Sequence, residues 1–140
     1  MFTIARATTD ADIAACFDVM RQLRPALQPD TFVGRVRVQE ANGYHLAALR
    51  DEGVVRSVAG YRYIENLYSG RVLYVDDLVT DDTVRSKGCG KAMLEWLLAR
   101  AREERCDTFE LDSGVQRFDA HRFYLVHRMA IVAHHFRMKV

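Results

Sequence analysis

Apolar positions recur with two different spacings along the chain, and each spacing predicts one kind of secondary structure. Runs of β-forming residues predict strands at 2–7, 44–49, 54–67, 71–80, 108–111 and 131–140. Apolar residues at helical spacing predict helices at 13–27, 30–42, 91–105 and 118–127. This order predicts an α/β (α+β) fold, in which a mixed central sheet of six or seven strands carries helices on both faces.

Two neighbouring stretches of this pattern matter most for function. Residues 71–80 form the most strand-like run, but Asp76-Asp77-Leu78-Val79 interrupts its alternation of apolar and polar residues, which predicts a bulge. Residues 91–105 form the clearest helix, because the apolar residues between Leu94 and Ala101 share one face. The two elements are joined by a polar segment that contains glycine.

Composition describes an ordinary globular protein. The chain has 140 residues without a repeat, linker or low-complexity tract, so a single domain over residues 1–140 is expected. A hydrophobic share of 49% and a charged share of 28% exclude a disordered tail or a fibre. The net charge of +1 argues against nucleic acid as a partner, although a local basic site for a small anion remains open.

Targeting and metal signals do not emerge from the sequence. The first residues include acids and no continuous apolar run, so no secretory signal is expected. No stretch approaches the roughly 20 apolar residues that cross a bilayer, so no membrane partner is expected. The three cysteines follow neither disulfide nor metal spacing, which predicts reduced thiols in a cytoplasmic protein. No metal is predicted.

The turn from Arg85 to Lys91 carries the most informative chemistry. Its backbone N–H groups lie at the positive end of the following helix dipole, where an anion is stabilised. Gly88 and Gly90 allow the backbone to approach a phosphate closely, and the basic side chains add charge. The turn therefore predicts a phosphate or pyrophosphate site, with an ordinary solvated basic loop as the alternative.

Two common nucleotide motifs do not fit this turn. A nucleoside triphosphate P-loop needs glycine where Arg85 stands and serine or threonine where Ala92 stands. A dinucleotide fingerprint needs its third glycine where Met93 stands. The anion predicted here therefore belongs to another class of ligand.

The pattern Arg85-x-x-Gly88-x-Gly90, preceded by a strand that ends Asp77-Leu78-Val79-Thr80, resembles the acetyl-coenzyme A signature of the GCN5-related N-acetyltransferase (GNAT) superfamily. The likeness covers nearly the whole chain, including Ala120-His121-Arg122-Phe123-Tyr124, and is weakest over residues 28–42. The sequences YHLA at Tyr44 and DAHRFYL at Asp119 are similar to small bacterial members, including aminoalkylphosphonate N-acetyltransferases.

This resemblance implies acetyl-coenzyme A as cosubstrate and assigns residues to it. Backbone groups of Leu78, Val79 and Thr80 would pair with the pantetheine arm as an added strand does. Arg85 would anchor the start of the phosphate loop. The pyrophosphate would be held by the backbone N–H groups of Ser86, Lys87, Gly88, Cys89, Gly90 and Lys91.

Two positions depart from the superfamily pattern. Asp82 stands where relatives often have proline, which places an acid near the phosphate loop without removing a backbone donor. Asp112-Ser113 stands where many relatives carry an asparagine that touches pantetheine, and this puts that contact in doubt.

The resemblance also suggests catalytic residues. Tyr124 is the candidate general acid, because the matching tyrosine of the superfamily lies beside the coenzyme sulfur and a phenol can protonate a departing thiolate. Asp77 is favoured over Asp76 as the base that takes a proton from the amine, directly or through water. A core tyrosine and a structural salt bridge are the respective alternatives. Arg56, Arg62 and Arg117 are candidates for an anionic group of the acceptor.

The predicted function is acetyl transfer to a primary amine of a small molecule by direct attack, since no Cys-His or Ser-His arrangement suggests a covalent intermediate. Two alternatives stay open. One is a non-catalytic acetyl-coenzyme A sensor or assembly module, and the other is acetylation of proteins or peptides. An edge strand near the C-terminus leaves a homodimer open.

Overall fold

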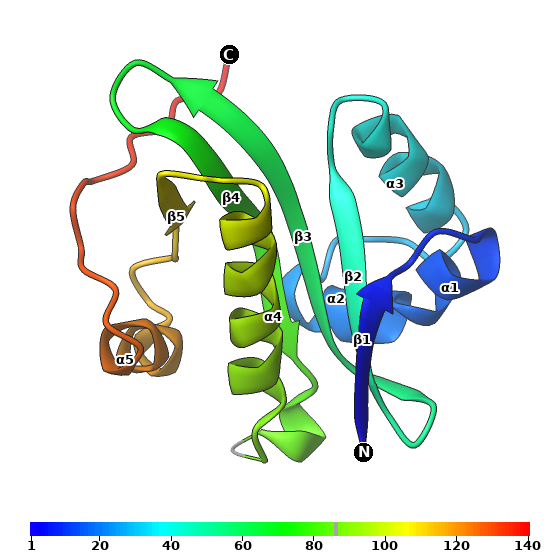
Figure 1. Cartoon of the computed structure of the whole chain (residues 1–140). Coiled ribbons are helices and arrows are strands. Elements are labelled where there is room, and N and C mark those ends of the chain that lie inside the picture. The colour runs from blue at the N-terminus through cyan, green and yellow to red at the C-terminus, as the bar shows by residue number, and fades with distance from the viewer. Residues whose placement is uncertain (86) are drawn as a thin grey trace. The chain divides into compact units, whose positions relative to one another are not determined.

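The computed structural model of the chain describes residues 1–85 and 87–140 and divides into two compact units, Met1–Glu110 and Leu111–Val140. Each unit is described by itself. The described residues of the first unit contain four α-helices, four antiparallel strands and all but the last residue of a short fifth strand (Figure 1). Their bounds are β1 (Phe2–Arg6), α1 (Asp10–Ala15), α2 (Phe17–Leu23), α3 (Phe32–Glu40), β2 (His45–Asp51), β3 (Val54–Asn66), β4 (Gly70–Thr80), α4 (Cys89–Glu103) and β5 (Thr108–Leu111).

The strands form one five-stranded sheet in the order β1-β2-β3-β4-β5. β1 to β4 pair with their sequence neighbours in antiparallel fashion, and α4 connects β4 to β5. α2 packs against β3 and β4 from one side of the sheet, and α4 packs against the same strands from the other (Figure 1). The α/β class with helices on both faces is confirmed.

Local sequence explains where the helices begin and end. The Thr9 hydroxyl accepts the Asp12 N–H at 3.1 Å and caps α1. α2 ends at Leu23 because Pro25 cannot continue a helix. The helical period over residues 13–27 is also divided at Cys16, which ends α1 and precedes α2. α4 buries the apolar face that its sequence predicts, including Leu94 and Leu97.

A bulge in β4 confirms the interruption seen in the sequence. Gly60 of β3 lies opposite Asp77, whereas the next residue, Tyr61, lies opposite Val75. Asp76 is therefore the extra residue, and a single extra residue changes which face the following side chains occupy.

The second unit contains one helix, α5 (Phe118–Val126), and an extended C-terminal segment. His121 Nε2 lies 2.7 Å from the carbonyl of Gly114, and His135 Nδ1 lies 3.1 Å from Asp112. Within the described residues of the whole chain, no helix combines the length and apolar character that crossing a membrane requires.

The prediction of a strand over residues 131–140 is wrong. The segment forms no strand, and its large apolar side chains, such as Phe136 and Val140, are exposed. β-forming residues specify a strand only where a partner strand supplies backbone hydrogen bonds. The other five predicted strands are all observed, so the sheet has five strands, fewer than the six or seven expected.

Candidate active site

The end of β4 has a backbone edge that no neighbouring strand of the described sheet covers. β3 pairs with one side of β4. On the other side, β5 has only four residues and begins beside Arg71, whose carbonyl accepts the Asp107 N–H at 2.7 Å. Four strand residues span about 13 Å, whereas Leu78 lies about 23 Å along β4 from Arg71. The outer backbone groups of Leu78, Val79 and Thr80 are therefore beyond the reach of β5.

The chain turns a corner directly after β4, and the Asp81 carboxylate holds this corner. Its Oδ1 accepts the Thr83 N–H at 3.1 Å and so caps the short 3-10 helix η1 (Asp82–Val84). Its Oδ2 accepts a hydrogen bond from Arg56 Nη1 at 3.1 Å. The Thr83 N–H, with further hydrogen bonds from Gln22 and Arg56, holds the pKa of Asp81 below its usual range.

The N-terminus of α4 follows this corner and offers backbone donors. Gly88 caps the helix with a φ of 91°, a left-handed conformation that favours glycine. The first hydrogen bond of the helix runs from the Ala92 N–H to the Gly88 carbonyl at 3.0 Å. The N–H groups of Cys89, Gly90 and Lys91 precede that bond, so they are donors at the positive end of the helix dipole.

The basic side chains near these donors are accessible to solvent. Arg85 ends η1, and Arg85 and Lys87 are both exposed. Lys91 Nζ lies 4.0 Å from Glu95, one turn further along α4. Ser86, another predicted backbone donor, lies outside the described residues. The predicted coenzyme residues that the structure describes thus follow one path from the edge of β4 through η1 to the start of α4.

Asp77 lies directly before the uncovered edge, and both of its carboxylate oxygens accept hydrogen bonds. Tyr44 Oη donates to Oδ2 at 2.7 Å, and Arg24 Nε donates to Oδ1 at 3.0 Å. Arg24 Nη2 also donates to the carbonyl of Asp76 at 2.9 Å. Each carboxylate oxygen has two lone pairs, so a further contact to each is chemically open. The Asp77 side chain is 15% exposed.

The bulge brings Asp76 to the same side of the sheet as Asp77, although strict alternation would separate them. Arg62 donates to the Asp76 carboxylate from both Nε and Nη2, with Nη2 at 2.6 Å from Oδ2. Its Nη1 also donates to the carbonyl of Asn42. The Arg62 guanidinium lies over the Tyr44 ring, 5.5 Å from its centre. Arg62 therefore forms an ion pair with Asp76, and Arg56 forms one with Asp81.

Tyr44 and Arg24 are residues that the sequence reasoning missed. Tyr44 is buried and packs so closely on Gly60 that a Cβ at position 60 would overlap its ring and Oη. Burial and then the Asp77 charge raise the pKa of the Tyr44 phenol, which keeps it a hydrogen-bond donor. The sequence feature that could have indicated such a contact was Gly60, because a glycine inside a strand often marks a place where another part of the chain approaches the backbone closely.

Tyr124, the predicted general acid, lies on α5 in the second unit. Its ring makes an edge-to-face contact with Phe123, with the ring centres 5.7 Å apart. Burial raises the pKa of Tyr124, and the Arg117 guanidinium acts in the opposite direction through its charge and a hydrogen bond. The phenol is therefore protonated at neutral pH, as a general acid must be. The catalytic role of Tyr124 stays a prediction.

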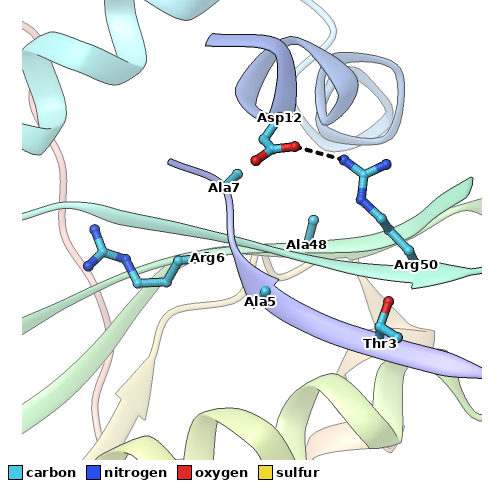
Figure 2. A pocket seen from close by; sticks show the side chains of 7 residues that line it. All are labelled: Thr3, Ala5, Arg6, Ala7, Asp12, Ala48 and Arg50. Atoms are coloured by element: carbon cyan, nitrogen blue, oxygen red, sulfur yellow. Dashed lines mark hydrogen bonds and ion pairs between the residues drawn. The ribbon is translucent and has the colours of Figure 1, made fainter. Parts of the chain in front are cut away.

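A pocket of about 190 Å³ lies elsewhere in the first unit, between β1 and α1 (Figure 2). Arg50 and Asp12 form an ion pair of 3.5 Å at its wall. None of the predicted coenzyme or catalytic residues that the structure describes lines this pocket. Its lining residues are Thr3, Ala5, Arg6, Ala7, Asp12, Ala48 and Arg50.

Comparison with known proteins identifies the family. The Acetyltransferase (GNAT) family model matches residues 13–127, which is most of the chain. The chain therefore belongs to the GNAT acetyltransferase family and is an acyltransferase of the N-acetyltransferase type.

Individual relatives agree with this assignment. The uncharacterized N-acetyltransferase YhdJ of Bacillus subtilis is 33% identical over 125 residues, which are 89% of this chain and 88% of that protein. An aminoalkylphosphonate N-acetyltransferase of Salmonella typhimurium is 29% identical over 98 residues, 70% of this chain and 62% of that protein. The fold is similar to that of aminoglycoside N-acetyltransferase AAC(6')-Iy, solved in complex with CoA, with a TM-score of 0.86 at 11% identity over 100% of this chain and 95% of that one.

Proposed function

We propose that the protein transfers the acetyl group of acetyl-coenzyme A to the primary amine of a small molecule, and that residues 1–140 act as one transferase domain. The observation that carries this proposal is the path from the uncovered edge of β4, through the corner that Asp81 holds, to the donors at the start of α4. A linear cosubstrate with an amide-containing arm and a pyrophosphate matches that order of groups.

The two ends of this path suit the two parts of the coenzyme. Pantetheine contains amide groups, which can pair with the outer backbone groups of Leu78, Val79 and Thr80 as a strand would. The pyrophosphate is anionic and is stabilised by the N–H groups at the α4 N-terminus. Arg85 and Lys87 add positive charge, and both are exposed. The aminoglycoside acetyltransferase that shares this fold was solved with CoA bound.

The reaction proceeds by direct attack of the amine on the thioester. The amine nitrogen forms a bond to the acetyl carbonyl carbon, and the bond from that carbon to sulfur breaks. Asp77 takes the proton that the amine loses, directly or through water, and Tyr124 protonates the departing thiolate. The products are the N-acetylated amine and free coenzyme A.

Small amines are the proposed acceptors. The relative from Salmonella typhimurium is named for aminoalkylphosphonates, and the AAC(6')-Iy relative is named for aminoglycosides. Asp77 lies beside the uncovered edge with lone pairs still open, so a cationic amine has a carboxylate to approach. We place the reaction in the cytoplasm. The free thiols of Cys16, Cys89 and Cys106 agree with a reducing compartment.

A turnover assay tests this function. Purified protein is incubated with acetyl-coenzyme A and a panel of aminoalkylphosphonates, aminoglycosides, amino sugars, polyamines and lysine peptides, and thiol release and acetylated product are measured. Turnover with at least one small amine, lost in Tyr124→Phe, is expected. Turnover with the peptides alone would contradict the small-molecule assignment, and coenzyme binding without any turnover would favour a sensor.

A further inference from the structure

The corner between β4 and η1 is clamped by a side chain from a distant helix. Gln22, near the end of α2, donates from Nε2 to Asp81 Oδ1 at 3.3 Å and accepts the Asp82 N–H on Oε1 at 2.9 Å. One carboxamide therefore contacts a side chain and a backbone group of consecutive residues. The contact ties α2 to the point where the proposed pantetheine edge becomes the phosphate loop.

We propose that Gln22 is a positioning residue for acetyl-coenzyme A, a role that rests on the proposed function. It fixes the corner at Asp81 and Asp82, and the corner fixes the spacing between the β4 edge and the α4 N-terminus. Both ends of the coenzyme must be held at once, so a loose corner weakens binding without altering the groups that touch the coenzyme.

Position 82 offers a way to test this role. The Asp82 N–H donates to Gln22, and this hydrogen bond restrains the backbone there. A proline at position 82 has no N–H and could not donate to Gln22, but its ring would restrict the backbone by itself. The backbone of Asp81, with φ −49° and ψ 125°, is also one that a following proline accepts. Asp82→Pro is therefore a sound test variant.

α2 is tied to β4 on both sides of the proposed coenzyme edge. Arg24, two residues after Gln22, contacts Asp76 and Asp77 before the edge, and Gln22 contacts the corner after it. The two contacts hold the segment from Asp77 to Asp82 at both ends, as a fixed binding segment requires.

The experiment measures acetyl-coenzyme A affinity by calorimetry for wild type, Gln22→Ala, Gln22→Glu and Asp82→Pro, with Gln28→Ala as the matched control. Gln28 is exposed, and among the described residues its side-chain amide hydrogen-bonds only to the nearby Ala26 carbonyl, at 3.5 Å. Loss of two partly exposed hydrogen bonds predicts about five- to tenfold weaker binding in Gln22→Ala. Gln28→Ala should stay within about twofold of wild type.

A rescue distinguishes positioning from a general loss of stability. In the Asp82→Pro background, Gln22→Ala should change the affinity by less than about twofold, because proline already restricts the corner. Gln22→Glu keeps the acceptor for the Asp82 N–H but places a second carboxylate beside Asp81. This variant should therefore also bind acetyl-coenzyme A more weakly, and it provides the test if Gln22→Ala fails to fold. Hydrogen exchange should show faster exchange of the Thr83 amide in Gln22→Ala.

The outcomes separate the two proposals. Normal coenzyme affinity in folded Gln22→Ala would overturn the role of Gln22 and leave the acetyltransferase proposal intact. An equal loss in the Asp82→Pro background would also overturn positioning through the corner. No binding by the folded wild type would overturn the proposed function and, with it, the role of Gln22.

Discussion

Gly60→Ala tests whether the Tyr44 contact really organises the site around Asp77. A Cβ at position 60 would overlap Oη, Cζ and Cε1 of Tyr44, so the ring must leave its buried place. Overpacking of this kind costs about 1–3 kcal/mol. The displaced phenol also loses its 2.7 Å hydrogen bond to the Asp77 carboxylate, which adds about 1.5–3 kcal/mol. We therefore expect the free energy of unfolding to fall by about 2.5–6 kcal/mol.

The control is a Tyr44→Leu background. Leucine ends at its Cδ atoms and lacks the three atoms that approach Gly60, so Gly60→Ala should change the free energy of unfolding there by less than about 1 kcal/mol. Urea denaturation, followed by circular dichroism for all four proteins, gives the coupling between the two positions. A Gly60→Ala effect below about 1 kcal/mol in wild type, or an equal effect in both backgrounds, would refute the contact.

Three further predictions concern the proposed coenzyme and catalytic residues. Tyr124→Phe should lower kcat at least about 100-fold while the acetyl-coenzyme A affinity, measured by calorimetry, changes less than about twofold; equal kcat would remove Tyr124 from the mechanism. Gly88→Ala should lower the free energy of unfolding by about 1–2 kcal/mol because of the positive φ, and Gly88→Asn by less, as thermal unfolding can show; equal stability of all three proteins would contradict the left-handed cap. Asp81→Asn should be less stable than wild type at pH 7, and because the folded pKa of Asp81 is lowered, the difference should shrink as pH falls below about 4 and through the folded pKa; a difference that does not change with pH would contradict the ionic corner.

The sequence predicted the elements whose cause is local. The helical face around Leu94 and Leu97 and the broken alternation at Asp76 are properties of adjacent residues, and both correspond to observed features. The segment at 131–140 also contains several β-forming apolar residues, yet it forms no strand, because pairing depends on a partner strand that the local sequence does not contain.

The candidate site also combines a feature that local sequence predicts with contacts that it does not. The turn around Gly88 was predicted from glycine and charge, and its positive φ agrees with that reasoning. The contacts of Asp77 with Tyr44 and Arg24 could not be predicted, since they join residues 33 and 53 positions apart. The clamp by Gln22 spans a similar separation, and an exposed glutamine in a helix has no sequence signal that distinguishes it from a solvated one.

The most direct test of the acetyltransferase proposal is calorimetric titration of the purified protein with acetyl-coenzyme A. Micromolar affinity, about −8 kcal/mol, is expected for wild type. Arg85→Ala and Gly90→Asp should both weaken it, whereas Arg102→Ala, in the last turn of α4, should bind like wild type. Absence of binding by folded wild-type protein, or equal affinity in all four proteins, would contradict a coenzyme site at the start of α4.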